Sequence, residues 1–179
     1  MVLVFLATGF EEIEAISTID ILRRAGIKVK TVSITGKKRV SGAHGIDIVA
    51  DMLFDKIPLN ADALVLPGGM PGTLNLKAHQ GLCTLLLSFA NRKDKTLAAI
   101  CAAPSIFGEL GLLKNKKATC YPGFEDQLTN AKVSRKSVVR DGNIITANGP
   151  GHAMDFALKI VEHLSGSEKA EEIRNGLNI

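Results

Sequence analysis

The 179-residue sequence contains no tryptophan, one tyrosine and only 4% aromatic residues. It therefore offers no aromatic platform on which nucleic-acid bases could stack. No apolar run approaches the ~20 residues that a membrane span requires, so no membrane association is expected. The first seven residues are apolar, have no basic segment before them, and are soon followed by Glu11 and Glu12. This pattern indicates a buried strand and not a signal peptide.

Cysteine is also scarce. Cys83, Cys101 and Cys120 are an odd number of cysteines and form no Cys-x-x-Cys motif. A disulfide framework and a zinc site are therefore not expected, and a reducing cytoplasm is the simplest location. The four histidines show no metal-ligand spacing either. We expect no bound metal and no cofactor.

The rest of the composition is that of a globular protein. With 46% hydrophobic and 22% charged residues, 17 glycines and 6 prolines, the chain is not a collagen, a coiled coil or a long disordered segment. The length fits one domain covering residues 1–179, which is large enough to bury a sizeable core.

The positive charge is concentrated in one segment. The formal net charge is +4, and the stretch from Lys114 to Asp141 carries that excess with seven cations against three anions. A basic stripe of this kind can bind nucleic acid. Lysines on a rim of loops and on an edge hairpin also prevent edge-to-edge strand pairing. We expect the second arrangement, and therefore no nucleic-acid partner.

Short apolar runs alternate with helical patterns along the chain. The expected strands cover residues 2–7, 29–34, 46–49, 63–66 and 97–100, and a hairpin covers 138–145. The expected helices cover residues 11–25, 79–90, 105–110, 151–164 and 167–175. Alternation of this kind predicts an α/β fold with a mostly parallel sheet and helices on both faces. Chemistry in such a sheet lies at the carboxyl ends of the strands.

One strand end has the pattern of a nucleophile elbow. The strand at 97–100 turns into a helix directly at Cys101, with small residues two positions before and after it. Amides at a helix N-terminus favour a thiolate and would lower the pKa of Cys101. The amide of Ala102 would point at whatever the sulfur attacks. The alternative is a buried cysteine that acts as a small hydrophobe, which we favour for Cys83 and Cys120.

Two further segments surround this strand end in the expected sheet. Gly68 and Gly69 follow the strand at 63–66, where they let the backbone approach a ligand closely; the loop lacks a phosphate-binding motif. Glu14 lies in an apolar stretch of the first helix, so its half-buried carboxyl would have a raised pKa and could give a proton to a thiolate. The helix dipole explains Glu11 and Glu12 without any further role.

Five motifs together resemble a known family. They are GFEEIE at 9–14, DILRRAG at 20–26, LPGG at 66–69, AICAAP at 99–104 and TANGPG at 146–151. In this order and spacing they resemble the ThiJ/PfpI superfamily, and more closely its Parkinsonism-associated deglycase (DJ-one) branch. The resemblance covers nearly the whole chain and implies a flavodoxin-like sandwich of the class I glutamine amidotransferase-like type.

The resemblance also implies a site. Cys101 looks like the family's nucleophilic, easily oxidised cysteine, and Glu14 matches the glutamate whose protonated carboxyl hydrogen-bonds that sulfur. Gly69 and Ala102 match the backbone amides beside it, and Gly68 is a supporting candidate.

A homodimer is implied as well. Asp20 and Arg24 fall in the helix that lies near the dimer interface and the site in the family.

The sequence departs from the branch at one position. The segment 119–122 reads Thr-Cys-Tyr-Pro, so Tyr121 stands where the branch often has a histidine close to the cysteine. A tyrosine is a poor general base at neutral pH, because its pKa is ~10. Glu14 or His44, which lies in a glycine-flanked loop, would have to replace that histidine. Ala102 follows the cysteine where the PfpI branch has histidine, which argues against proteolysis.

Two functions of different classes remain open. By resemblance, the first is a cysteine-dependent enzyme that acts on small aldehydes or reactive dicarbonyls or their adducts, of the glutathione-independent glyoxalase or deglycase type. The second is a redox sensor or stress chaperone without turnover, switched by oxidation of Cys101.

Overall fold

A seven-stranded sheet forms the centre of the molecule in the computed structural model, which describes residues 1–58 and 60–179. In spatial order its strands are β10 (Val138–Asp141), β11 (Ile144–Ala147), β7 (Thr96–Ile100), β6 (Ala63–Leu66), β1 (Val2–Leu6), β2 (Val29–Ser33) and β5 (Met52–Leu53). Every neighbouring pair is parallel except the antiparallel hairpin β10–β11 at one edge. The predicted parallel sheet is confirmed.

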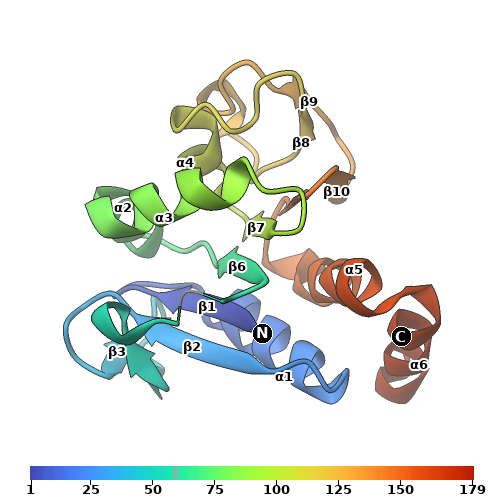
Figure 1. Cartoon of the computed structure of the whole chain (residues 1–179), viewed down its shortest axis with the longest axis horizontal. Helices are drawn as coiled ribbons and strands as arrows, with labels where there is room; N and C mark the ends of the chain where they lie inside the picture. Colours follow the sequence, from blue (N-terminus) through green and yellow to red (C-terminus); the bar gives the residue numbers. More distant parts are fainter. Residues whose placement is uncertain (59) are drawn as a thin grey trace.

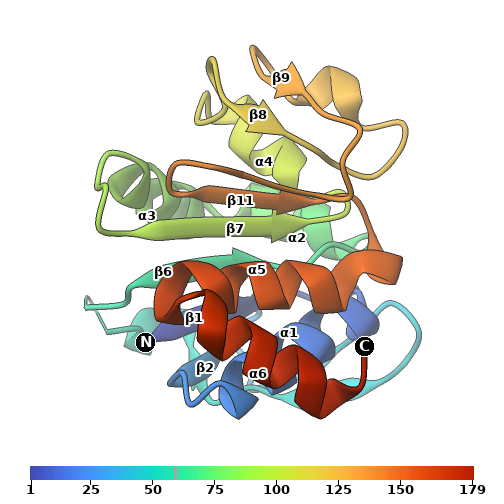
Figure 2. The same ribbon diagram turned by 90° about the vertical axis from the view of Figure 1, so that its right-hand side faces the viewer.

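Helices cover both faces of this sheet (Figure 1). One face carries α1 (Glu12–Arg24), α5 (Ala153–Ser165) and α6 (Ser167–Leu177), and the other carries α2 (Gly72–Ala78), α3 (Gln80–Ala90) and α4 (Pro104–Glu109). Figure 2 shows the first group in front of the strands and the second behind them. The flavodoxin-like layering expected from the sequence is therefore present.

The central strands explain why the sheet is covered on both sides. In β1 the side chains of Val2, Val4 and Leu6 belong to the core under α1 and α5. Leu3 and Phe5 point the other way, into the core under α3 and α4. Because side chains alternate between the two faces of a strand, a continuous apolar run must be covered by an apolar layer on each face of the sheet. Each fully buried aliphatic side chain contributes about 1.5–3 kcal/mol.

Smaller elements lie at the periphery. They are the antiparallel pair β3 (Arg39–Ser41) and β4 (Asp47–Val49), the parallel pair β8 (Lys117–Ala118) and β9 (Lys132–Val133), and the 3-10 turns η1 (Phe54–Lys56), η2 (Glu125–Gln127) and η3 (Pro150–His152). No helix in the described part of the chain is both long enough and apolar enough to cross a membrane.

The elements predicted from the sequence lie within two residues of those observed, but one edge of the sheet and one helix differ from the prediction. The strand predicted at 46–49 is β4, which pairs with β3 outside the central sheet, and the short edge strand β5 was not predicted. Helix α2 was not predicted, because Pro71 and Gly72 at its start are typical of a loop. Cys120 lies in irregular, buried chain after β8, which ends at Ala118. Its burial agrees with the packing role that was favoured for it.

Candidate active site

Cys101 occupies a strained turn at the carboxyl end of β7. Its φ angle is +63°, in the left-handed region that a non-glycine residue adopts at an energetic cost of about 1–3 kcal/mol. The turn is fixed by backbone bonds: the N–H of Cys101 donates to the carbonyl of Ala147 at 2.9 Å, and its carbonyl accepts from the N–H of Tyr121 at 2.8 Å. The backbone therefore has the sharp turn of the expected elbow. Hydrogen bonds to Ala147 and Tyr121, in two other segments of the chain, hold this turn in place.

Small residues make room for this turn. Ala99 and Ala103 are fully buried on either side of Cys101, and Pro104 begins α4 three residues later. The backbone N–H groups of Ala102 and Gly69 lie beside the sulfur and lower the pKa of the thiol. The two amides that the sequence singled out thus converge on one atom.

Gly68 brings the loop after β6 into contact with the elbow. A Cβ atom on Gly68 would lie 2.6 Å from the Cβ of Cys101 and 2.9 Å from Oε2 of Glu14. Real side-chain atoms do not approach so closely, so only glycine fits between the cysteine and the glutamate. Gly69 follows with φ +91°, which also suits glycine.

Glu14 is fully buried, not half-buried as the sequence suggested. Its Oε2 accepts a 2.7 Å hydrogen bond from the N–H of Gly68. Its Oε1 is also buried and receives no well-formed hydrogen bond from the described residues. Burial raises the pKa of Glu14 to about 7, against the lowering effect of the Gly68 and Cys101 hydrogen bonds. The predicted direction is correct, and the carboxyl titrates near neutral pH.

The pKa of Cys101 moves opposite to expectation. Burial, followed by the negative charge of Glu14 and the hydrogen bond between the two side chains, raises it to about 12. The amides of Ala102 and Gly69 oppose this but do not outweigh it. Helix α4 is short and begins only at Pro104, so the dipole invoked from the sequence is weak at Cys101. The sulfur and Glu14 therefore form a coupled pair in which a protonated Glu14 favours the thiolate.

Glu12 has a structural role that the sequence interpretation missed. Its carboxylate is buried and accepts from the backbone N–H groups of His44 (2.6 Å) and Ile46 (3.3 Å), and it bonds His44 Nδ1 at 2.9 Å. Burial alone would raise the pKa of Glu12, but these hydrogen bonds lower it. No local signal could have shown this, because the partners lie more than thirty residues away.

The same contact fixes the position of His44. Its ring is 69% exposed and is hydrogen-bonded to Glu12, with Glu11 Oε2 at 3.6 Å. Hydrogen bonding to Glu12, together with the charges of Glu11 and Glu12, raises the pKa of His44. Ligand atoms of these three residues lie within 4.8 Å of one another, so they are the one group in the described chain with the spacing to hold a metal ion.

The remaining candidates are placed as follows. Tyr121 is 44% exposed, and its backbone N–H donates to the carbonyl of Cys101. Asp20 and Arg24 form an exposed 2.6 Å ion pair on α1. Cys83 lies in α3, where its thiol donates to the carbonyl of Lys77 at 3.3 Å.

This geometry defines a class of protein: a flavodoxin-like α/β protein with a cysteine elbow and a buried carboxyl at the carboxyl end of its parallel sheet. A family model described as the DJ-1/PfpI family matches residues 1–163. Protein dj-1beta of Drosophila melanogaster is 42% identical over 98% of this chain and 95% of its own length. A Pyrococcus horikoshii protein named as a deglycase is 35% identical over 91% of this chain and 98% of its own.

Solved structures agree. The crystal structure of Drosophila melanogaster DJ-1beta superposes with a TM-score of 0.95 at 40% identity, covering 99% of this chain and 97% of that one. An oxidized Toxoplasma gondii DJ-1 gives 0.94 at 37% identity, covering 98% and 96%. The chain belongs to the DJ-1/PfpI family and has its class I glutamine amidotransferase-like fold.

Proposed function

We propose that this protein is a cysteine-dependent enzyme that converts small reactive dicarbonyls, or their adducts, without glutathione. The observation that carries the proposal is the convergence of Glu14 and the amides of Gly69 and Ala102 on the strained Cys101. The relative named as a deglycase supports the same class of substrate.

The pKa values suggest how the pair would work. With a pKa of about 7, Glu14 is partly ionised at neutral pH and is poised as a general base. It takes the thiol proton of Cys101 as the sulfur adds to the aldehyde carbon of methylglyoxal. The carbonyl electrons move to oxygen, which the amides of Gly69 and Ala102 stabilise. Glu14 then returns the proton to that oxygen, giving a hemithioacetal.

The remaining steps need only water. Glu14 removes the proton from the carbon bonded to sulfur, which gives an enediolate, and delivers it to the neighbouring carbonyl carbon. The hydroxyl proton of the hemithioacetal passes to the neighbouring oxygen, and a lactoyl thioester results. Water hydrolyses the thioester to lactate and frees the thiol. Methylglyoxal plus water becomes lactic acid, so no oxidant or reductant enters the balance.

The test is lactate formation from methylglyoxal by the purified chain. We expect activity in the wild type and in Cys83→Ser, and none in Cys101→Ser. Cys83 is the matched control because it is also a free, partly buried cysteine. Absence of lactate in the wild type, or equal rates in the two serine variants, would show that the proposal is wrong.

One observation also favours a redox role for the same sulfur. The two amides that would hold an oxyanion would equally hold a sulfinate on Cys101. A related structure is described as oxidized. Intact-mass and peptide analysis after mild peroxide should then show two added oxygens on Cys101 alone. Equal oxidation of Cys83 and Cys120 would count against a dedicated sensor.

We also propose that the chain forms a homodimer through α1. Ile13 and Ile16 are 57% and 43% exposed on this helix, close to the Asp20–Arg24 pair. Sedimentation velocity should give a dimer for the wild type and a monomer for Ile16→Asp. A wild-type monomer would refute this interface.

A further inference from the structure

A groove of about 470 Å³ lies between the edge strand β10, the β8–β9 pair and α5. We call it the basic groove and define it by the five cations that line it. They are Lys117, Lys132, Lys136, Arg140 and Lys159. Valines of β9 and β10 make up the apolar part of its lining, and no aromatic residue lines it. The groove shares no lining residue with Cys101 and its partners.

Most of the charge in the basic groove is unpaired. Within residues 1–58 and 60–179, the ion pairs include none formed by Lys117, Lys132, Lys136 or Arg140. Lys159 pairs with Glu162 at 2.5 Å.

One other carboxylate lies nearby. Asp141 accepts the backbone N–H of Lys117 at 2.8 Å, so it bonds the backbone of that residue and not its ammonium group. The cations therefore outnumber the carboxylates at the groove.

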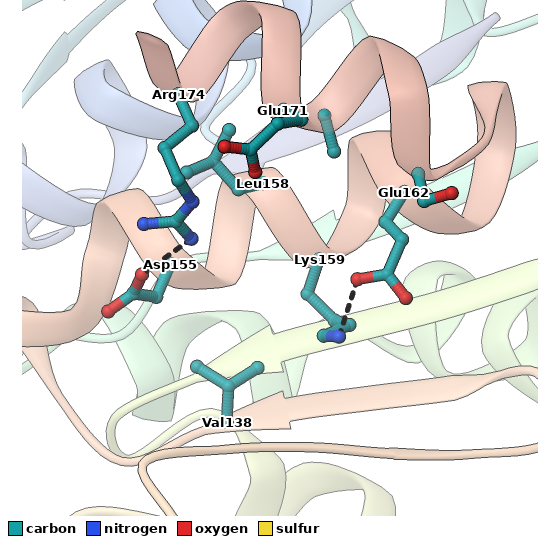
Figure 3. Close-up of a pocket in the computed structure, with 9 residues that line it drawn as sticks. Val138, Asp155, Leu158, Lys159, Glu162, Glu171 and Arg174 are labelled. Carbon is teal, nitrogen blue, oxygen red and sulfur yellow. Dashed lines mark hydrogen bonds and ion pairs between the residues drawn. The ribbon is translucent and has the colours of Figure 1, made fainter. Parts of the chain in front are cut away.

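The neighbouring pocket between α5 and α6 provides an internal comparison (Figure 3). It shares Val138 and Lys159 with the basic groove. Both of its cations are paired, since Arg174 pairs with Asp155 at 3.2 Å and Lys159 with Glu162, and it is also lined by the carboxylate of Glu171. That pocket therefore has more carboxylates than cations, whereas the basic groove has more cations than carboxylates.

The backbone holds the cations in place. The N–H of Lys132 donates to the carbonyl of Lys116, and the N–H of Ser134 donates to that of Ala118, both at 2.8 Å. Arg140 Nε donates to the carbonyl of Gly142 at 3.1 Å, which keeps part of its guanidinium at the hairpin turn. Like charges gathered in this way repel one another, and an anion that binds among them relieves the repulsion.

The lining indicates which anion fits. Lysine and arginine side chains are the usual partners of phosphate groups. Without an aromatic side chain, the groove has no surface on which a base could stack. Its volume lies in the range of small-molecule sites. We propose that the basic groove binds a compact ligand with two or more phosphate groups.

The experiment uses the purified full chain and tripolyphosphate as the probe. Calorimetry should show one site per chain, with inorganic phosphate binding much more weakly. The exposed double variant Lys132→Gln/Lys136→Gln should lower the affinity roughly tenfold. The matched control is Lys37→Gln/Lys38→Gln, which removes the same charge from an exposed loop elsewhere and should change little.

Three outcomes would overturn the proposal. The first is an equal loss of affinity in both double variants, and the second is several equivalent sites per chain; either means that the protein attracts anions non-specifically. The third is an oligonucleotide that binds in the groove while tripolyphosphate does not. That result would make nucleic acid the partner, with an affinity that falls steeply with salt.

Discussion

The N–H of Gly68 donates a 2.7 Å hydrogen bond to Oε2 of Glu14, beside the sulfur of Cys101. This single bond joins the loop after β6 to the first turns of α1, and it orients the carboxyl towards the elbow. Glu14 is a buried acid that keeps its place because a backbone donor partly replaces water. The pKa of Cys101 therefore depends on Glu14, which lies in α1, far from the cysteine in the sequence.

The first prediction concerns alkylation of Cys101 as a function of pH. The wild-type thiol should ionise well above the ~8.5 of a free cysteine, because burial and the Glu14 carboxylate raise its pKa. Glu14→Gln removes the charge, so the midpoint should move down by about 1 pH unit or more. Peptide mass spectrometry after iodoacetamide pulses at a series of pH values measures the midpoint of Cys101 alkylation. Glu11→Gln is the control, and an unchanged midpoint in Glu14→Gln would contradict the coupling.

The second prediction concerns stability. The pKa of Glu14 is about 7 in the folded state, against the ordinary value of 4.5 that applies to the unfolded chain. Between pH 4.5 and 7 the folded state therefore binds more protons than the unfolded state. The free energy of unfolding must then fall as pH rises through this interval. Glu14→Gln cannot ionise, so its advantage over the wild type should grow with pH, to at most about 3 kcal/mol above pH 7. Urea unfolding of both proteins at acid and alkaline pH measures this difference in unfolding free energy. A difference that does not change with pH would refute the raised pKa of Glu14.

The third prediction compares two glycines. Gly68→Ala should destabilise the fold by about 1–3 kcal/mol, since the new methyl would lie 2.6 Å from the Cβ of Cys101. Gly176→Ala in α6 meets nothing within 4 Å and should stabilise it by about 0.5–1 kcal/mol. Thermal unfolding distinguishes the two. Similar effects at both positions would mean that the close approach at Gly68 is not real.

The fourth prediction concerns the position where the branch often has histidine. The backbone N–H of Tyr121 bonds the carbonyl of Cys101, and the residue is 44% exposed. Tyr121→Phe should therefore change the rate of lactate formation by no more than about twofold. A much larger loss in this variant, with an unchanged melting temperature, would assign the phenol hydroxyl a part in the reaction.

The sequence was sufficient to predict the central strands of the sheet and the elbow, because both depend on local pattern. The run ending at Ile100 is apolar throughout, and Pro104 fixes the start of the next helix. The raised pKa of Glu14 also followed from its apolar neighbours. These features need only the identity of residues close in the chain.

The wrong interpretations at the candidate site involve contacts between distant segments. The burial of Glu12 depends on amides of the loop at 44–46, and the raised pKa of Cys101 depends on how completely Glu14 is enclosed. The prediction of a lowered pKa for Cys101 considered only the helix that follows the cysteine. It could not include the carboxylate of Glu14, which belongs to α1.

The bond between Tyr121 and Cys101, together with the position of Gly68, also makes the thiol a reporter of refolding. Its environment is complete only when β1, β6, β7 and β11 have assembled and α1 has docked. A refolding intermediate that lacks any one of them would leave the thiol with ordinary reactivity. The moment at which pulse labelling of Cys101 stops would therefore time the joining of the N-terminal and C-terminal halves of the chain.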